Sequence, residues 1–276
     1  MNLQSYFFTI DPVGLTGAAA QRYVSQVHEH LRWIYRTSSG RLLLNCVRRP
    51  SFPVVIRPHP INECNATGGS ERTSPTPTAV RGFVTYTPGH YGHGGVCGTK
   101  HGARNSGRLF DEILFHELVH VFRTATGKWD QSASLGWAMR QYDDNEEYVA
   151  TLCTNIYIAD RSNKIKTSLR AGHRGFDAMS AAEAGRFSFF SSSATALTLV
   201  KKFCADNPIF TKAISDKLGD VEYNPIADYL RFPKLCEAFS IFGQFNDRRQ
   251  FEASLKANGV TATVIEFLMH PIAPPR

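Results

Sequence analysis

The sequence FDEILFHELVHVF, from Phe110 to Phe122, constrains the fold more than any other part of the chain. Its apolar residues surround the helix that the pattern predicts, so we expect this helix to be buried. In its central part only His116, Glu117 and His120 interrupt the apolar run. A buried helix does not keep a glutamate and two histidines without compensation, because burying unpaired charge is costly. A bound divalent cation provides that compensation.

The spacing of these three residues is that of a zinc site. Residues four apart lie one turn above the other on the same face of a helix, so His116 and His120 can bind one metal ion. Glu117 then projects beside the metal, where it can accept a proton from a water. Because zinc lowers the pKa of its water to about 7, the motif predicts hydrolysis at neutral pH.

A catalytic zinc site needs a third protein ligand and one open position. The segment DDNEEYVATLCTNIY begins the next predicted helix, about Asp144–Ala159, and offers Glu146 or Glu147. An acidic helix start also suits the helix macrodipole, which accounts for part of the cluster without a metal. It does not explain why a second glutamate runs into the apolar part of the helix. Either glutamate is therefore a candidate ligand.

The motif HELVH, a short connection and an E-E pair opening a second helix resemble the layout of the glutamate-type zincins, the gluzincins. Within them, NEEYVATLCTNIY followed by SLRAGHRGF resembles the zinc metallopeptidase family of bacterial effectors, which includes type III effectors that cut host MAP kinases. Clostridial neurotoxin light chains share a comparable arrangement. The resemblance extends only over about Phe110–Phe176. It implies a zincin-like α+β core, with a small mixed sheet beside the active-site helix and Glu147 as the third zinc ligand.

The same resemblance implies a zinc-dependent endopeptidase that acts on a protein substrate in a target cell, as a secreted bacterial effector or toxin. It leaves room for a secretion-apparatus, immunity or chaperone partner. The N-terminal sequence MNLQSYFFTIDPVG lacks the features of a conventional signal peptide. We therefore expect synthesis in the bacterial cytoplasm and export by a route that needs no such signal.

The oxyanion that develops during peptide hydrolysis needs a nearby hydrogen-bond donor. Arg170 and His173 are catalytic candidates for this role, because they lie in SLRAGHRGF directly after the second helix. Tyr157, within that helix, is a third candidate. The first two residues also fit a basic surface loop, and Tyr157 also fits a core position.

The remaining sequence predicts an α+β architecture. Apolar spacings of three and four predict a helix over Thr16–Arg36, and SYFFTID, RLLLNCV, PVVIRPH and GFVTYTP have the composition of strands. We expect residues 1–160 to form the catalytic core and residues 161–276 a mostly helical part packed on it, unless 1–276 is one domain. Helices are predicted in that second part near Ser180–Gly185, Ala194–Asp206, Thr211–Leu218, Pro225–Phe242 and Asp247–Asn258.

Residues 59–106 are rich in Gly, Pro, Ser, Thr, Asn and His. A long irregular segment inside a compact domain is usually functional or disordered, and this one leads directly into the HELVH helix. We expect it to form one wall of a cleft. The strand GFVTYTP within it is predicted to be an edge strand that pairs with an extended substrate.

Composition narrows the class of protein. The net charge is +7, but the basic residues are scattered, so we expect no specific nucleic-acid surface. No apolar run is long enough to span a membrane. The six cysteines form no C-x-x-C pair, and reduced thiols are the expectation for a chain of this size. If one disulfide exists, Cys64–Cys97 is the predicted pair.

Two other functions fit the motif. A cell-wall peptide metallopeptidase would use the same zinc chemistry on peptidoglycan. A non-catalytic binding module would hold a structural zinc with four protein ligands and would give Glu117 no role. A basic nucleic-acid binder is a third possibility, and it predicts salt-dependent affinity that is independent of metal.

Overall fold

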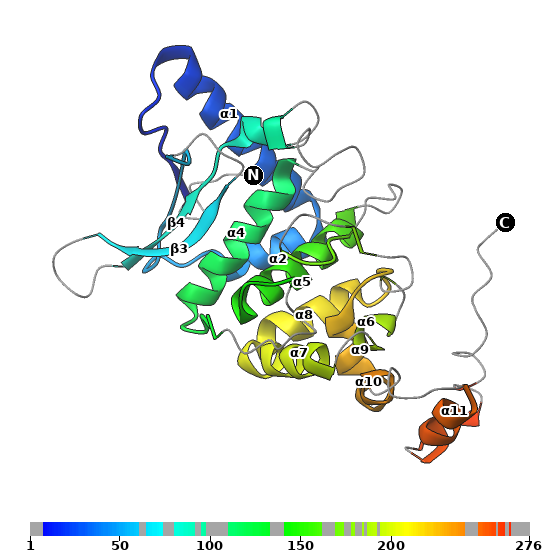
Figure 1. The fold of residues 1–276 in the computed structure, drawn as a ribbon. Helices are drawn as coiled ribbons and strands as arrows, with labels where there is room; N and C mark the ends of the chain where they lie inside the picture. Colours follow the sequence, from blue (N-terminus) through cyan, green and yellow to red (C-terminus); the bar gives the residue numbers. More distant parts are fainter. Residues whose placement is uncertain are drawn as a thin grey trace.

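The structure is a computed structural model that describes residues 8–60, 65–73, 80–91, 95–97, 110–132, 141–161, 169–173, 178–179, 184, 187–191, 194–240, 248–257, 259–262 and 265. These residues form an α+β fold in which a small mixed sheet lies on one side of a larger helical part (Figure 1). This agrees with the fold class expected from the sequence at the level of α+β.

The sheet has four strands in the order β1-β2-β4-β3. Strands β1 (Phe8–Ile10), β2 (Val54–Arg57) and β4 (Val80–Thr85) are parallel to one another. Strand β3 (Thr67–Arg72) pairs antiparallel with β4, with Gly68 opposite Val84 and Ser70 opposite Gly82. Strand β3 is thus at the edge of the sheet, with β4 as its neighbour among the described strands.

The helices follow in chain order. They are α1 (Gly17–Arg36), α2 (Ser38–Val47), the short 3-10 helix η2 (Pro88–His90), α4 (Phe110–Ala125), α5 (Asn145–Arg161), α6 (Ser188–Ser191), α7 (Ala194–Asp206), α8 (Pro208–Leu218), α9 (Pro225–Arg231), α10 (Pro233–Ser240) and α11 (Arg248–Ala257). None of these helices is both long enough and apolar enough to cross a bilayer.

Helix α4 lies at the centre of the fold. It packs on β3 and β4 on one side and on α2 and α5 on the other, so it lies between the sheet and these two helices (Figure 1). Every residue from Asp111 to Arg123 is buried, as the apolar pattern predicted. The polar side chains of this helix are therefore held at fixed positions in the interior.

The contact between α4 and the edge strand requires glycine at position 68. A Cβ atom on Gly68 would lie 2.2 Å from the backbone oxygen of Glu117, far closer than atoms can approach. The absence of a side chain lets β3 lie directly against the HELVH turn of the helix. The sequence TGGSER, which has little strand propensity, thus becomes the strand nearest to the histidines.

Three expectations for the elements were wrong. RLLLNCV forms most of helix α2, because Leu43, Leu44 and Val47 pack into the core at helical spacing and Thr37 caps the helix by accepting a hydrogen bond from the Gly40 backbone. Short apolar runs fit either structure, and packing decides between them.

The helix expected over Pro225–Phe242 is instead two helices, α9 and α10, because Pro233 cannot continue the first one. Strand β4, which contains most of GFVTYTP, is an interior strand, and β3 takes the edge position.

The other predicted elements lie close to the observed ones. Helix α1, strand β2 and helices α4, α5, α7, α8 and α11 are confirmed, with ends shifted by a few residues in some cases. The helix expected over Ser180–Gly185 lies almost wholly outside the described residues.

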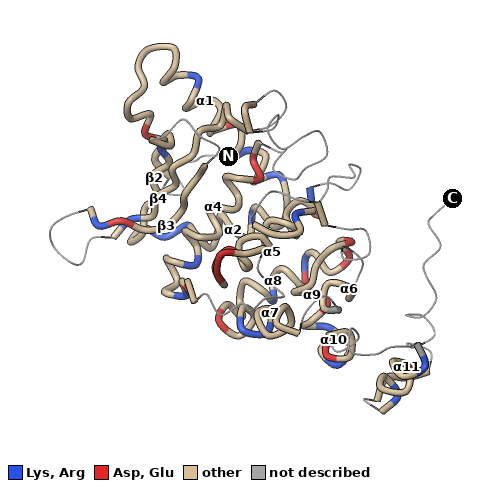
Figure 2. Tube along the Cα trace, viewed as in Figure 1, with Lys and Arg blue, Asp and Glu red and all other residues tan. Residues whose placement is uncertain are grey.

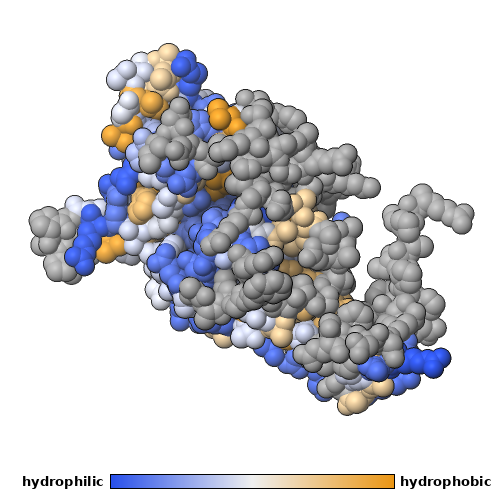
Figure 3. All heavy atoms as spheres, viewed as in Figure 1, coloured by the Kyte–Doolittle hydropathy of each residue, from blue (hydrophilic) through white to orange (hydrophobic). Residues whose placement is uncertain are grey.

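Neither one sign of charge nor hydrophobic residues dominate the described surface in Figures 2 and 3. Figure 2 shows Lys and Arg spread over strands and helices, and the acidic start of α5 in red. Figure 3 shows hydrophilic residues over much of the described part of this face, with hydrophobic residues scattered among them.

The cysteines depart from the expectation of reduced thiols. Cys97 is in a disulfide, whereas Cys46, Cys153, Cys204 and Cys236 are free. Cys64, its predicted partner, lies outside the described residues.

Candidate metal centre

Helix α4 brings the two histidine rings of HELVH together. His116 and His120 are each 3% exposed, and their Nε2 atoms lie 3.2 Å apart. Adjacent ligand atoms of a tetrahedral zinc site are about 3.3 Å apart when the metal–nitrogen bonds have their usual length. The two nitrogens are thus already spaced as ligands of one ion.

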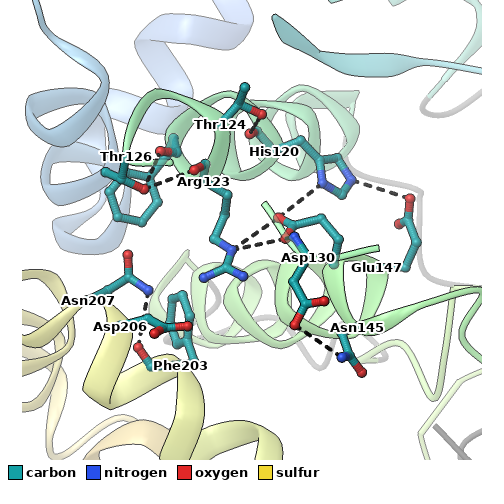
Figure 4. A network of polar contacts seen from close by, with 12 residues as sticks. His120, Arg123, Thr124, Thr126, Asp130, Asn145, Glu147, Phe203, Asp206 and Asn207 are labelled. Carbon is teal, nitrogen blue, oxygen red and sulfur yellow. Dashed lines mark hydrogen bonds and ion pairs between the residues drawn. The ribbon is translucent and has the colours of Figure 1, made fainter. Parts of the chain in front are cut away.

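Glu147 reaches both histidines from α5. Its Oε2 lies 3.0 Å from His116 Nε2, and its Oε1 lies 3.5 Å from His120 Nε2. Figure 4 shows the carboxylate of Glu147 facing the ring of His120 across the gap between the two helices. The first turn of α5 is held in place because Asp144 accepts a hydrogen bond from the Glu147 backbone N–H at 2.9 Å.

Thr154 sets the tautomer of His116. The Thr154 hydroxyl donates to the Ala150 carbonyl at 2.7 Å, so it has no second proton to donate. Its 3.4 Å contact with His116 Nδ1 therefore requires that Nδ1 carry the hydrogen and donate it. This leaves the lone pair of Nε2 pointing toward Glu147. Partners of this kind on the far ring nitrogen are typical of metal-binding histidines.

Glu146 does not take the ligand position beside Glu147. Its side chain is 1% exposed and accepts from Arg123 Nε at 3.1 and 3.2 Å and from the Asp130 backbone N–H at 3.2 Å. Its Oε1 also lies 3.6 Å from His120 Nδ1, an ion-pair distance on the side of the ring away from Glu147. Glu146 thus links Arg123, His120 and the turn at Asp130.

The protonation of the cluster follows from burial and contacts. Burial lowers the pKa of His116 to about 3, so this ring is neutral at pH 7. Burial also lowers the pKa of His120, but contacts with Glu146 and Glu147 outweigh it and raise the pKa to about 10. For Glu147, the contacts with the two histidines outweigh the burial that raises its pKa and hold it well below the usual value. The cluster therefore places a positive charge between carboxylates.

Glu117 lines a cleft beside the candidate ligands. Its carboxylate is 6% exposed and accepts a hydrogen bond from the Gly68 backbone N–H of β3. Burial raises the pKa of Glu117 to about 7, with a smaller opposing effect of His120. A carboxyl group with a pKa near neutrality can both accept and release a proton, as a general base must.

His173 joins the cluster from the segment after α5. Its Nε2 lies 3.3 Å from Glu147 Oε2, and its ring stacks on that of His116 at 5.7 Å between centroids. His116, Glu147 and His173 each offer a ligand atom within 4.8 Å of the others. The other ring nitrogen of His173, Nδ1, lies 2.7 Å from Asp143 Oδ2, which fixes the orientation of the ring. Sequence reasoning missed this role of Asp143, although the residue belongs to the acidic run DDNEE.

The other two catalytic candidates lie away from the cleft. Arg170 is 1% exposed; it donates to the His173 carbonyl at 3.1 Å, and its backbone exchanges hydrogen bonds of 2.8 and 2.9 Å with Asn155. It therefore fastens the His173 segment onto α5. Tyr157 is fully buried and donates to Asp111, in a separate cluster.

A cleft of about 630 Å³ opens onto this centre. The edge strand forms one wall with residues 65–70, and α4 and the turn after it form the other. Its lining also includes Phe83, Glu117, His120, Thr124, Trp129, Gln131, Glu147 and His173. His90, from the histidine-rich part of 59–106, is not among the described lining residues, and His93 and His101 lie outside the described part of the chain.

The interface between α4 and α5 carries more negative than positive charge. Among the described residues, five buried or half-buried carboxylates face three guanidinium groups; the carboxylates are Asp111, Glu112, Glu117, Glu146 and Glu147, and the guanidinium groups belong to Arg123, Arg161 and Arg170. Buried charge in proteins is normally paired or bound to a metal. The carboxylates outnumber the guanidinium groups by two, and the proton on His120 offsets one of these charges. A divalent cation that replaced this proton would balance both. The donor set, two imidazoles and a carboxylate, also suits zinc.

Comparisons with protein-family models, with curated proteins and with solved structures gave no match to this chain.

Proposed function

We propose that this protein is a zinc-dependent endopeptidase with a zincin-like core. His116, His120 and Glu147 would hold the zinc. The observation that carries the proposal is the convergence of the His116 and His120 Nε2 atoms, 3.2 Å apart, on the two oxygens of Glu147. The tautomer of His116 and the excess of two carboxylates support the same ligand set.

When bound, zinc supplies a nucleophilic water at neutral pH and polarises the scissile carbonyl. Glu117 accepts the proton of the attacking water and passes it to the leaving nitrogen, for which its near-neutral pKa is suited. In its imidazolium form, which the Asp143 carboxylate favours, His173 donates from Nδ1 to Asp143 and from Nε2 to the oxyanion. Glu146 and Arg123 hold the His120 ring in place from behind.

The edge strand would hold the substrate. An extended peptide that adds to β3 gains backbone hydrogen bonds from the strand and passes in front of Glu117, because Gly68 lies against that residue. This favours a protein or peptide chain over a small substrate. The proposal includes, from the resemblance of Phe110–Phe176 alone, a secreted bacterial effector or toxin whose substrate lies in a target cell.

The position of His173 also supports the non-catalytic alternative. Its Nε2 is near enough to Glu147 that it could complete a set of four protein ligands, which would close the site to water. A structural zinc of this kind would bind to a Glu117→Gln variant and to the wild type alike, and neither would cleave a peptide.

Metal content of matched variants tests the proposal. Wild type, Glu146→Gln and Glu147→Gln would be purified without added metal, saturated with zinc and freed of unbound metal. Mass spectrometry would then measure their zinc content, and circular dichroism would confirm folding. We expect about one zinc per chain in the wild type and in Glu146→Gln at saturating zinc, and loss in Glu147→Gln. No zinc in the wild type after zinc is supplied would overturn the proposal. Loss in Glu146→Gln alone would reassign the third ligand.

A further inference from the structure

Trp129 is an exposed aromatic residue beside the metal centre. It lies in the turn after α4, lines the cleft and is 37% exposed. Its ring centroid lies 5.4 Å from that of His120, at an interplanar angle of 59°. An exposed tryptophan in a cleft offers a large, rigid apolar surface to a ligand.

The turn that carries Trp129 is fixed by its neighbours. The Asp130 backbone N–H donates to Glu146, and the Asp130 carboxylate accepts from the Ser132 backbone at 3.1 Å and from its hydroxyl at 2.6 Å. Asn145, the first residue of α5, donates to both Asp130 and Ser132. Because Glu146 also lies against His120, the position of Trp129 is tied to that of a proposed zinc ligand. A contact surface held in this way needs little ordering when a ligand binds.

The surroundings of Trp129 favour an uncharged partner. Apart from Glu117, Glu147 and the histidines of the centre, the described residues that line the cleft carry no formal charge. Thr124 and Gln131 lie on the side of Trp129, and Phe83 lies across the cleft behind Gly69. A charged substrate side chain would lose water here without gaining an opposite charge, whereas an apolar one would cover the indole.

The direction of β3 indicates which part of the substrate lies near Trp129. Gly68 lies against Glu117, and Gly82, the partner of Ser70, lies against Val121. Strand β3 therefore runs along α4 toward the end that leads into Trp129. A peptide that pairs antiparallel with β3, the more stable arrangement, runs the opposite way. Its residues on the N-terminal side of the scissile bond then lie toward Trp129.

We propose that Trp129 forms the wall of a subsite that selects an apolar side chain on the residue immediately N-terminal to the scissile bond. The position relative to the scissile bond rests on the proposed function, because that function places the bond at the metal centre. The selection of an apolar side chain by the indole does not depend on turnover.

A binding experiment tests the selection without catalysis. Zinc-loaded Glu117→Gln protein would be immobilised and exposed to capped octapeptides randomised at every position, and the retained peptides would be sequenced by mass spectrometry. We expect enrichment of Leu, Met, Phe or Tyr over Asp and Lys at one position, by about tenfold or more. Adding Trp129→Ala should remove most of this enrichment, and adding Trp129→Phe, which keeps a flat apolar wall, should retain it. Equal enrichment with and without Trp129 would overturn the proposal.

Cleavage by the active protein tests the position. The same peptides would be incubated with wild type, Trp129→Ala and Trp129→Phe, and the new termini would be mapped, with zinc content measured for each variant. We expect the apolar preference directly before the cut, and a loss in Trp129→Ala that appears mainly in KM. A Trp129-dependent preference after the cut would overturn the assigned position. Peptides that are retained but never cut would count against the proposed function and leave the binding result valid.

Discussion

Helix α4 carries two buried polar clusters of different kinds. Near its start, the Asp111 cluster joins Asp111 to Arg161 and to the Tyr157 hydroxyl, and Arg161 also lies over the rings of Trp33 and Phe110. One and two turns later, the metal centre gathers His116 and His120 around Glu147. The first cluster pairs one negative with one positive charge, whereas the second belongs to an interface with two carboxylates in excess.

The difference favours the second cluster over the first as the proposed ligand site. The Asp111 cluster satisfies its own charges, and none of its residues lines the cleft. The metal centre turns imidazole nitrogens and carboxylate oxygens toward one point and opens onto the cleft. Burial alone does not separate a structural cluster from a site, since both are buried. Charge balance and the direction of the donor atoms do.

The largest expected effect belongs to Glu117. Glu117→Gln should lower peptide hydrolysis by about two to four orders of magnitude, because the amide cannot accept a proton. Zinc content should stay at the wild-type level, since Glu117 is not among the proposed ligands. Turnover of a generic fluorogenic peptide mixture and metal analysis of the same samples would measure both. Full activity in this variant would remove Glu117 from the general-base role.

The matching change in the Asp111 cluster should affect stability instead. Asp111→Asn keeps the shape of the side chain but leaves Arg161 without its carboxylate. Breaking a buried pair costs about 3–5 kcal/mol, and the lower end applies because the Arg161 side chain is 15% exposed. Urea unfolding would measure the loss, and zinc content at saturating zinc should be unchanged. If this variant lost its zinc while staying folded, the two clusters would not be independent.

The close contact between β3 and the HELVH turn gives a third test. Gly68→Ala would place a methyl group against the Glu117 carbonyl, so the strand must move away from the helix. Forced contacts of this kind cost about 1–3 kcal/mol. The Gly68 backbone N–H also donates a hydrogen bond to the Glu117 carboxylate, which the movement would disturb. The peptidase activity of the folded variant should therefore fall by more than its loss of folding stability explains. The adjacent Gly69→Ala is the control, as its added carbon would meet only Phe83 at 3.6 Å. Equal effects of the two variants on activity would show that the contact at Gly68 is not special.

Sequence predicted the local parts of the site and missed those that depend on distant packing. His116, Glu117 and His120 follow from spacing within one helix, and the structure places the two histidines together. Spacing could not separate Glu146 from Glu147, because adjacent residues of α5 point in different directions and only the packing against α4 decides which one meets the histidines. Trp129 lies in the segment that the sequence predicts only as a short connection between the two helices.

The same division holds for the fold. Helices with strong apolar periodicity, such as α1 and α4, were predicted within a few residues. RLLLNCV was assigned to the wrong class because a short apolar run has no clear period. Strand β3 was missed because TGGSER carries no strand signal, and it forms through pairing with β4 and the fit of Gly68 against α4.

The smallest expected effect is a pH dependence that originates next to the Asp111 cluster. Burial, with a smaller contribution from Arg161, lowers the pKa of His30 to about 3. The Tyr86 hydroxyl donates its hydrogen to the Phe110 carbonyl. It therefore accepts a hydrogen bond from His30 Nδ1 at 2.7 Å, which the neutral His30 ring can make. Its pKa in the unfolded chain is about 6.5, so between these values the unfolded state binds more protons. Stability from this group is therefore complete above about pH 6.5 and falls as the pH is lowered toward 3.

From pH 7 to about pH 5.5 the loss should be about 1 kcal/mol. Other groups titrate in the same range. The measurement is therefore the difference in unfolding free energy between wild type and His30→Gln, determined by urea unfolding at several pH values across the interval. Glutamine can donate to Tyr86 but cannot gain a proton, so the variant should lack this part of the slope. Parallel curves for the two proteins would mean that His30 is not held neutral in the folded state. A reduced slope would show that His30, which lies on α1 and stacks on Phe110 beside the Asp111 cluster, takes up no proton in the folded protein over this interval.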